Sequence, residues 1–348
     1  MHKDYTDNQS KEIHQSQAKS SSLRRLRSLF VAVLLTLATT MATAFFVRFS
    51  PPASPAQQAT LATAFRQLTK NTAWTQTDVI EVDFDTYHGQ GFAKVGTYLF
   101  LSSVEVLEPT RRYDAPREGL DRTAGRGKGH LFKMDLSGRL LAQIELGGGA
   151  IYHPGGIDFD GTHLWVPVAE YRPDSRAIVY RVDPASMQAV EVFRFDDHLG
   201  GLVHNPDDGT LHGVSWGSRR FYTWQLDEAL RLAEAGASSG PLRTLNPAHY
   251  IDYQDCQYVG AGEALCAGLN HYRQPTVGRA FALGGLELID LRQGLPLHQI
   301  PVPLWTEQGL TLTRNPVELE ATETGLRGYF MPEDNQSRLF IFDVSLRR

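Results

Sequence analysis

Imidazole and carboxylate side chains recur in this 348-residue sequence at places where chemistry could be done. One set, which contains His88, His153 and His198, comes just before runs with the alternating pattern of β-strands, and a second set comes just after such runs. Neutral imidazoles and ionised carboxylates are the usual ligands of divalent metals and the usual general acids and bases. We therefore predict one polar site with these members: Glu170 and His153 as catalytic residues; Glu105, Glu170, His271 and Asn335 as ligands of a divalent metal such as calcium; and Arg172, His88, His198, Asn270 and Asp334 as ligand-binding residues.

The histidines also have a purely structural explanation. Glycines follow His153 in the run His-Pro-Gly-Gly, and glycine permits a tight bend that an imidazole can cap by a hydrogen bond. Glu105 and Glu170 point more strongly to function, because a carboxylate directed at the centre of a fold is costly unless it is paired or bound.

The segments that carry these side chains belong to an internal repeat. Its clearest copy, residues 152–183, has the order strand, glycine turn, strand, loop, strand, and it overlays without a gap on residues 87–105. Three further copies begin at His198, Tyr250 and Val317. Self-similarity with a period of tens of residues is typical of propellers and other repeat folds. The sequence predicts an all-β fold, a five-bladed β-propeller, with six blades as the alternative if the long insertions contain further strands.

The overlay aligns Glu105 with Glu170 and His88 with His153. In a propeller blade, the loop that leads into the innermost strand and the loop that joins the second strand to the third emerge on the same face. We therefore expect the predicted site residues to converge on that face and to bind a small molecule there.

Two long basic insertions, residues 108–128 and 273–283, belong to the same face by this reasoning. The first contains Arg112, Arg117 and Arg122, and such arginines could form a lid that recognises an anionic small molecule. The alternative is ordinary loop charge in contact with solvent.

The last copy of the repeat ends without a fourth strand. Residues 78–84 precede His88 as residues 190–195 precede His198, so an N-terminal strand is available to complete the last blade. We predict that residues 78–84 pair with residues 339–344, which would close the ring and remove its exposed edges.

The two cysteines, Cys256 and Cys266, lie at equal distances on either side of Ala261 in a predicted hairpin. They should face each other across the two strands, and in an oxidising compartment they can form a disulfide. The alternative is a pair of buried free thiols.

The N-terminal part of the chain indicates a membrane segment. Residues 28–47 carry no charge and follow a basic cluster at Arg24, Arg25 and Arg27, which predicts a helix that spans a bilayer with its N-terminal side in the cytoplasm. We therefore divide the chain into a cytoplasmic tail (1–27), a transmembrane signal-anchor (28–47), a linker (48–76) and the propeller (77–348). The expected location is the inner membrane, with a single pass and a periplasmic C-terminal domain. The alternative is a signal peptide, cleaved after the Ala-Thr-Ala sequence at 42–44, that leaves a periplasmic or secreted protein.

Charge and motifs exclude several classes of function. The formal net charge is −5 with both signs interspersed, so we expect no nucleic-acid partner. The sequence has no P-loop, dinucleotide fingerprint, nucleophile elbow or zinc-protease helix motif.

The run HPGGIDFDG at 153–161, followed by WVPVAEYRP at 165–173, resembles the domain-of-unknown-function family 6454, and the similarity covers nearly everything after Thr77. That family has no assigned activity, so the resemblance supports the fold. The glycine and aspartate residues at the strand starts are more loosely similar to those of lactonase-type propellers, which hold an axial calcium with carboxylate and Asn side chains. This sequence is richer in histidine, which leaves the identity of the metal open. Two functions remain: a metal-assisted hydrolase or lyase of a small molecule, or a non-catalytic propeller that binds a ligand or a partner protein.

Overall fold

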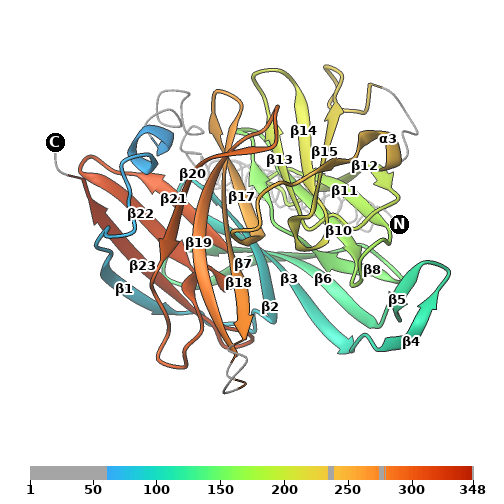
Figure 1. Cartoon of the computed structure of the whole chain (residues 1–348), viewed down its shortest axis with the longest axis horizontal. Coiled ribbons are helices and arrows are strands. Elements are labelled where there is room, and N and C mark those ends of the chain that lie inside the picture. The colour runs from blue at the N-terminus through green and yellow to red at the C-terminus, as the bar shows by residue number, and fades with distance from the viewer. Residues whose placement is uncertain (1–60, 234–238, 274–277, 279, 347–348) are drawn as a thin grey trace, which may run out of the picture. The chain divides into compact units, whose positions relative to one another are not determined.

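The chain forms five antiparallel sheets that are arranged as the blades of a propeller (Figure 1). The structure is a computed structural model, and it describes residues 61–233, 239–273, 278 and 280–346. The prediction of an all-β fold with five blades is confirmed, and the six-bladed alternative is not. The predicted membrane segment, residues 28–47, lies outside the described residues. Among the residues that are described, no helix has the length and apolar character needed to cross a membrane.

Four of the blades contain four strands and blade 2 contains five; the strands are given from the innermost to the outermost. Blade 1 consists of β2 (His88–Val95), β3 (Tyr98–Glu108), β6 (Arg126–Asp135) and β7 (Leu140–Leu146). Blade 2 consists of β8 (Ile151–Pro154) and β9 (Asp158–Phe159), which both pair with β10 (Leu164–Glu170), and then β11 (Ala177–Val182) and β12 (Ala189–Phe195). Blade 3 consists of β13 (Gly201–Asn205), β14 (Thr210–Val214), β15 (Arg220–Gln225) and β16 (Thr244–Leu245). Blade 4 consists of β17 (Asp252–Gly260), β18 (Glu263–Arg273), β19 (Ala280–Asp290) and β20 (Leu295–Val302).

Blade 5 confirms the predicted closure of the ring. It consists of β21 (Val317–Ala321), β22 (Gly325–Phe330), β23 (Arg338–Ser345) and, as its outermost strand, β1 (Thr75–Glu81). The register pairs Thr75 with Asp343 and Glu81 with Arg338. The strand therefore begins and ends three residues earlier than the predicted range 78–84, but its partner is the predicted one.

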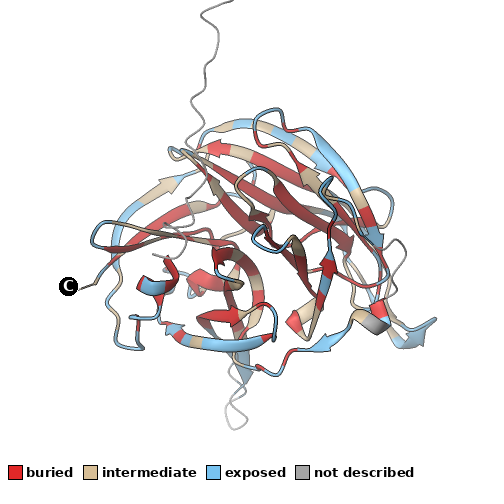
Figure 2. Ribbon diagram, turned by 90° about the horizontal axis from the view of Figure 1, so that it is seen from above, coloured by how far each residue is buried: buried red, intermediate tan, exposed pale blue. Residues whose placement is uncertain are grey.

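Turn chemistry explains where the third strands end. Four aspartates at these ends accept hydrogen bonds from backbone amides two to four residues later, as expected for tight turns, and they are Asp135, Asp183, Asp227 and Asp290. Asp343, the fifth in the repeat, instead forms an ion pair with Arg327 across the sheet of blade 5. Seen from above, buried residues fill the inner strands, and exposed residues concentrate on outer strands and turns (Figure 2).

Two buried aspartates join the blades where the innermost strands meet. Asp158 in blade 2 accepts backbone N–H groups from blades 3 and 4, and Asp255 in blade 4 accepts them from blades 1 and 2. The donors are the amides of His204, Tyr258, Phe92 and Ile157. A backbone hydrogen bond from Val317 adds blade 5 to the group that Asp255 holds. Burial raises the pKa of Asp158 to about 7 despite these bonds, and it raises the pKa of Asp255 as well.

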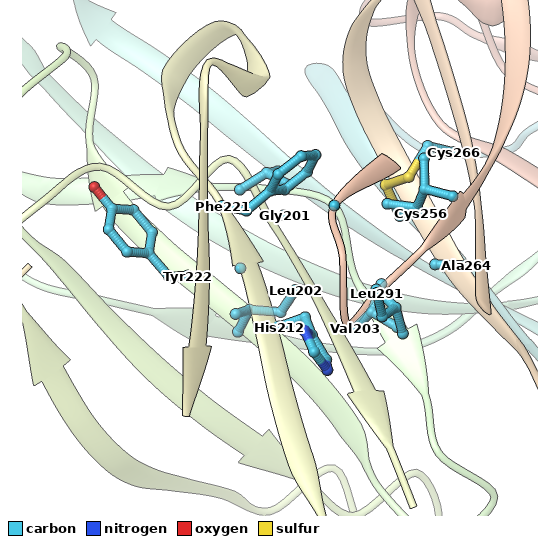
Figure 3. Close-up of a pocket in the computed structure, with 14 residues that line it drawn as sticks. Gly201, Leu202, Val203, His212, Phe221, Tyr222, Cys256, Ala264, Cys266 and Leu291 are labelled. Atoms are coloured by element: carbon cyan, nitrogen blue, oxygen red, sulfur yellow. A yellow bond between two sulfur atoms is a disulfide. The ribbon is translucent and has the colours of Figure 1, made fainter. Parts of the chain in front are cut away.

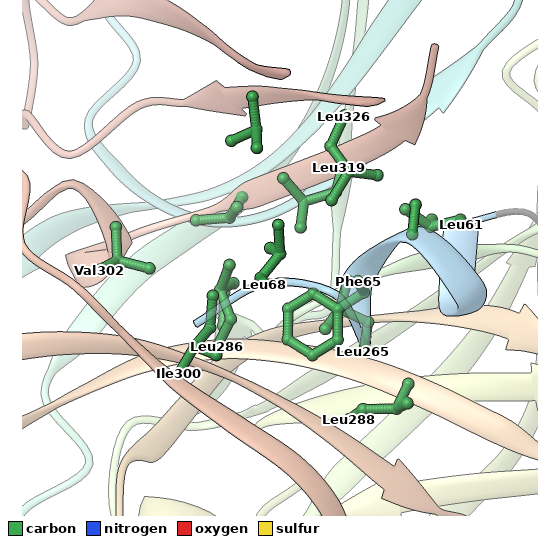
Figure 4. Packing of buried hydrophobic residues seen from close by; sticks show 14 of the residues in the cluster. Leu61, Phe65, Leu68, Leu265, Leu286, Leu288, Ile300, Val302, Leu319 and Leu326 are labelled. Atoms are coloured by element: carbon green, nitrogen blue, oxygen red, sulfur yellow. The ribbon is translucent and has the colours of Figure 1, made fainter. Parts of the chain in front are cut away.

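A short N-terminal segment belongs to the core. Residues 61–65 are helical, and Leu61, Phe65 and Leu68 are buried against leucines of blades 4 and 5, such as Leu288 and Leu326 (Figure 4). This corrects the predicted linker at 48–76, because its described part, residues 61–76, belongs to the propeller. The sequence did not show this, because a short amphipathic segment does not reveal which surface its apolar side chains cover.

The predicted disulfide is confirmed. Cys256 and Cys266 are bonded, and they lie directly opposite each other on β17 and β18. The disulfide lines a small apolar cavity of about 20 Å³ between blades 3 and 4, together with residues such as Leu202 and Phe221 (Figure 3). A cavity of this size holds about one water molecule, so it is a packing gap and too small for an organic ligand.

Candidate functional site

One face of the propeller carries the loops that lead into the innermost strands and the loops that join second strands to third strands; we call it the site face. The first basic insertion projects from this face as a two-stranded hairpin of β4 (Arg112–Arg117) and β5 (Leu120–Arg122) (Figure 1). The strands β18 and β19 also extend beyond the rest of blade 4 here, because their register continues to the pair of Arg273 and Ala280. Both insertions thus lie where the sequence places them.

A histidine and an aspartate from neighbouring blades form a hydrogen-bonded pair on the site face. His88 is the first residue of β2, and its Nδ1 lies 2.8 Å from Oδ1 of Asp334, which follows β22. Arg314 and Asn315 donate to the same carboxylate at 2.9 and 3.1 Å. Burial alone would raise the pKa of Asp334, but the hydrogen bond and charge of His88 and the charge of Arg314 lower it to about 2. The carboxylate is therefore ionised at neutral pH and accepts the Nδ1 proton of His88.

This pairing orients the imidazole. In the neutral form of the ring this hydrogen bond places the proton on Nδ1 and leaves the lone pair on Nε2, and the side chain is 28% exposed. A histidine that is held by a carboxylate in this way has the arrangement of an oriented general base.

The backbone next to each member of the pair has an unfavourable conformation. Tyr87, directly before His88, and Asn335, directly after Asp334, both have left-handed backbone conformations, with φ of 53° and 62°. Their backbones are joined, since the amide of Asn335 donates to the carbonyl of Tyr87 at 2.6 Å. Such conformations cost about 1 to 3 kcal/mol each and persist where the surroundings enforce them, often at functional sites.

Four aromatic and histidine side chains form a second group, which we call the histidine–aromatic cluster: His153, Tyr171, His198 and Trp216. The rings of His153 and Tyr171 are stacked with centroids 4.0 Å apart, and those of His198 and Trp216 meet edge to face at 4.8 Å. The two histidine rings are 5.7 Å apart. The guanidinium of Arg122, from the hairpin of β4 and β5, lies 5.1 Å above the Trp216 ring. One arginine of the predicted lid therefore covers this cluster.

Burial keeps both histidines of the cluster neutral. It lowers the pKa of His198 to about 4 and that of His153 well below the ordinary value, and the charges of His198 and His88 lower the pKa of His153 further. In His198, Nδ1 lies 2.9 Å from the backbone carbonyl of Glu170, and a carbonyl can only accept, so Nδ1 carries a proton.

Several polar groups of the cluster lack partners. Nδ1 of His153 is buried without a hydrogen bond, although this residue is only 5% exposed. Within the described part of the chain, the Tyr171 hydroxyl and the Trp216 indole N–H have no hydrogen-bond partner either. Native proteins satisfy the large majority of buried polar groups, so the buried, unpartnered Nδ1 of His153 indicates a place where a polar ligand could bind.

The histidine–aromatic cluster and the His88–Asp334 pair are near enough on the site face to influence each other electrostatically. Burial raises the pKa of Tyr171, the charge of Asp334 raises it further, and Arg122 and Arg314 oppose this. These electrostatic interactions require that the two groups lie near each other on the site face.

Glu170, which the sequence predicts to be catalytic and to bind metal, forms ion pairs with two arginines. It is 1% exposed, and Arg172 contacts one carboxylate oxygen while Arg176 contacts the other at 2.7 Å. Arg172 also donates to the backbone carbonyl of Arg122 at 3.1 Å, so Glu170 supports both the histidine–aromatic cluster and the hairpin that covers it. Because arginines contact both of its carboxylate oxygens, Glu170 affects the site through the positions of Arg172 and of the hairpin that Arg172 contacts.

The predicted equivalence of Glu105 and Glu170 is correct in register but not in surroundings. His88 pairs with Val104, and His153 pairs with Ala169, so each glutamate follows the partner of the aligned histidine. Glu105, however, is 25% exposed and lies 3.2 Å from Nε2 of His130. The sequence overlay thus predicts the backbone position of each glutamate correctly, but it does not predict which side chains the carboxylate contacts.

The remaining predicted metal ligands do not join these glutamates. His271 is exposed on β18, and Asn335 is exposed beside Asp334. Asn270 donates to the backbone carbonyl of His249 at 3.1 Å. Across the described ranges, no three His, Cys, Asp or Glu side chains are grouped so that they could hold a metal ion. The predicted ligands therefore do not fit a coordination site as they lie, and a bound cation stays a prediction.

His88, His153, His198, Arg172 and Asp334, which the sequence predicts to lie together, are all on the site face. The sequence prediction missed the site contributions of Tyr171, Trp216, Arg314 and Asn315. The first two could have been found, because they stand next to the aligned second-strand ends at Glu170 and Gly217.

A family model matches residues 46–348, and it describes a family of unknown function, DUF6454. The chain belongs to this family. No curated protein matches the chain.

Among solved structures, the chain is similar to a hypothetical protein from Leishmania major, with 10% identity, a TM-score of 0.46 and coverage of 82% of this chain and 94% of that one. It is also similar to a periplasmic gluconolactonase of Pseudomonas aeruginosa, with 11% identity, a TM-score of 0.34 and coverage of 74% and 88%. A third is the tail fibre of Staphylococcus aureus phage P68, with 8% identity, a TM-score of 0.39 and coverage of 79% and 53%. The family is one of unknown function, so membership of it assigns no chemistry to the chain.

Proposed function

We propose that the site face binds a small organic molecule and acts on it by general base catalysis from His88, as a hydrolase or a lyase. The observation that carries this proposal is the pair of His88 and Asp334. Asp334 is ionised and held by two further donors, so it fixes His88 with Nε2 as the acceptor.

The histidine–aromatic cluster would bind the substrate beside this base. Tyr171 and Trp216 offer an unpartnered hydroxyl and an unpartnered N–H, and the stacked rings offer a flat apolar surface. In hydrolysis, Nε2 of His88 takes a proton from water and the water oxygen bonds to the electrophilic carbon or phosphorus. The bond from that atom to the leaving oxygen then breaks, and the imidazolium returns the proton to the leaving oxygen. In a lyase reaction, Nε2 takes a proton from carbon instead, and the leaving group departs with the electron pair.

We also propose that the propeller lies outside the cytoplasm, attached through residues 28–47. The disulfide between Cys256 and Cys266 supports this location, because such bonds persist mainly in oxidising compartments.

The test is a screen of the purified chain against small esters, lactones and phosphate esters, followed by variants on any substrate that is turned over. His88→Gln should lower kcat/KM by about 10²- to 10⁴-fold, and Asp334→Asn should lower it less, because the base remains but loses its orientation. His298→Gln, in the outer strand β20, is the matched control and should leave turnover unchanged. Turnover that survives in His88→Gln contradicts the proposal.

The second candidate is a propeller that binds the same ligand without reaction. The unpartnered groups of Tyr171, His153 and Trp216 favour it, because they require only a ligand. A compound that binds saturably and whose affinity is unchanged in His88→Gln, with no product formed, would establish this function instead.

A further inference from the structure

A second hollow lies on the opposite face of the propeller, where the turns between first and second strands are found. Its volume is about 390 Å³, within the range of small-molecule sites. It lies between blades 2 and 3, and its polar lining consists mainly of Asp160, His163, His204, Asp208, Asp227 and Glu228. We call it the opposite-face hollow.

His204 is the unusual member of this lining. It is 3% exposed, and its Nδ1 lies 2.8 Å from Oδ2 of Asp160, which itself also accepts the indole N–H of Trp165 at 2.7 Å. Burial would raise the pKa of Asp160, but its hydrogen bonds to His204 and its neighbours lower it, so the carboxylate is ionised and accepts the Nδ1 proton. In the neutral form of the ring this hydrogen bond leaves the lone pair on Nε2 of His204, and Nε2 is buried without a hydrogen-bond partner.

The equivalent contact between the next two blades has no such unsatisfied atom. There the Tyr258 hydroxyl donates to Asp207 at 2.6 Å, which joins a turn of blade 3 to the innermost strand of blade 4. A tyrosine completes that contact with one hydrogen bond. In the corresponding contact, His204 uses one ring nitrogen and has a second nitrogen without a partner. A contact with only a structural role requires one hydrogen-bonding atom, as the tyrosine shows.

The charge of the hollow has one sign. Four of its lining residues are acidic, and none is lysine or arginine. Asp208 and Asp227 also accept amides of their own turns, and Asp227 lies 3.7 Å from Arg231. Glu228 is exposed and has no hydrogen-bond or ion-pair partner among the described residues. The polar lining thus offers mostly acceptors, beside apolar surface from residues such as Leu226 and Leu230.

We propose that the opposite-face hollow binds an organic cation: an ammonium or guanidinium group on a short apolar chain, whose N–H groups are accepted by His204 and by the carboxylates of Asp208 and Glu228. A hollow of this volume suits a chain of several carbon atoms better than a bare ion, and Leu226 and Leu230 would cover that chain. The site is independent of the proposed reaction, because His88 and Asp334 lie on the other face.

The experiment is calorimetric titration of the purified full-length chain with 1,4-diaminobutane, with 1,4-butanediol as a neutral probe of the same length. The diamine should bind saturably and the diol should not. Glu228→Gln and Asp208→Asn should each weaken diamine binding by about threefold to fivefold, as expected for exposed carboxylates. Glu323→Gln is the matched control, because this exposed glutamate lies in a turn of blade 5 on the same face and outside the hollow.

A spectroscopic measurement tests His204 without changing it. In protein with ¹⁵N-labelled histidine, the Nε2 resonance of His204 should shift on addition of the diamine, and that of His298 should not. The proposal is overturned if the diamine does not bind saturably, if Glu323→Gln weakens binding as much as Glu228→Gln does, or if the His204 resonance does not move. Each result is obtained whether or not the protein proves to be an enzyme, so failure here is distinguishable from failure of the site-face proposal.

Discussion

Asp255 at the centre of the propeller and His153 on its site face are buried to a similar degree, but they differ in their hydrogen bonds. Asp255 is 2% exposed, and its carboxylate accepts the backbone amides of Phe92 and Ile157. His153 is 5% exposed, and its Nδ1 accepts and donates nothing. Both side chains resist ionisation because burial disfavours their charged forms. Asp255 and His153 therefore differ in hydrogen-bond satisfaction and not in burial.

The largest effect on stability is expected at the centre. Asp255→Ala should lower the free energy of unfolding by about 3 to 5 kcal/mol, because it removes an acceptor that blades 1, 2 and 5 share and leaves their amides unsatisfied. Asp255→Asn, which keeps one acceptor oxygen, should cost less than half of this. Urea unfolding measures both values, and a cost below about 1 kcal/mol for the alanine variant would remove the distinction between the two regions.

His153→Phe should affect function and not stability. A phenyl ring can keep the stack on Tyr171, while it removes the unpartnered nitrogen. We expect the free energy of unfolding to change by less than about 1 kcal/mol and kcat/KM, or ligand affinity, to fall by about 10²-fold. Thermal unfolding and the kinetic assay check this together. A variant that loses stability but keeps activity would place His153 in the structural class with Asp255.

The two regions should respond to pH with opposite signs. The pKa of His198 is lowered to about 4, so the unfolded chain binds more protons between pH 6.5 and 4, and the His198 contribution to stability is lost as pH falls through this window. The pKa of Asp158 is raised to about 7, so the folded chain binds more protons between pH 4 and 7, and the Asp158 contribution is lost as pH rises. Each slope is on the order of 1 kcal/mol per pH unit.

The measurement compares urea unfolding at about pH 5 and about pH 7 for the native chain and two variants. Asp158→Asn should be stabilised, relative to the native chain, more at the higher pH, and His198→Gln should be stabilised more at the lower pH. Parallel pH profiles for the two variants would contradict the assigned protonation states.

The smallest expected effect concerns Glu170. Because both of its oxygens already contact arginines, calcium should raise the melting temperature of the native chain by less than about 1 °C. Glu170→Gln should lower the melting temperature without creating or removing a calcium response. A clear rise with calcium that Glu170→Gln abolishes would restore the predicted metal site.

The fold could be predicted from the sequence repeat. The site could be predicted only in part, because its side chains come from blades that are far apart in the sequence. The glycine turns and alternating runs locate five blades, the missing last strand locates the closure, and the symmetry about Ala261 locates the disulfide. The partner of His88 is 246 positions away, and nothing local marks it. The pairing of Glu170 with Arg172 and Arg176 depends on how one loop folds back, which periodicity does not specify. Periodicity therefore predicts backbone position, and contacts between blades decide what each side chain does.

The joining of β1 to β23 has a consequence for how the chain is made. The hydroxyl of Thr77 donates to the carbonyl of Ile341, and these residues are 264 positions apart. During synthesis, β1 is among the first described strands to emerge, and its partner is the last, so β1 must wait unpaired until almost the whole chain has been delivered. Contacts of such separation slow folding, and a waiting strand edge can pair with other chains. A chain that stops before residue 338 has no ring at all, and its two unpaired edges would make it a target for proteases and chaperones rather than a smaller version of the same protein.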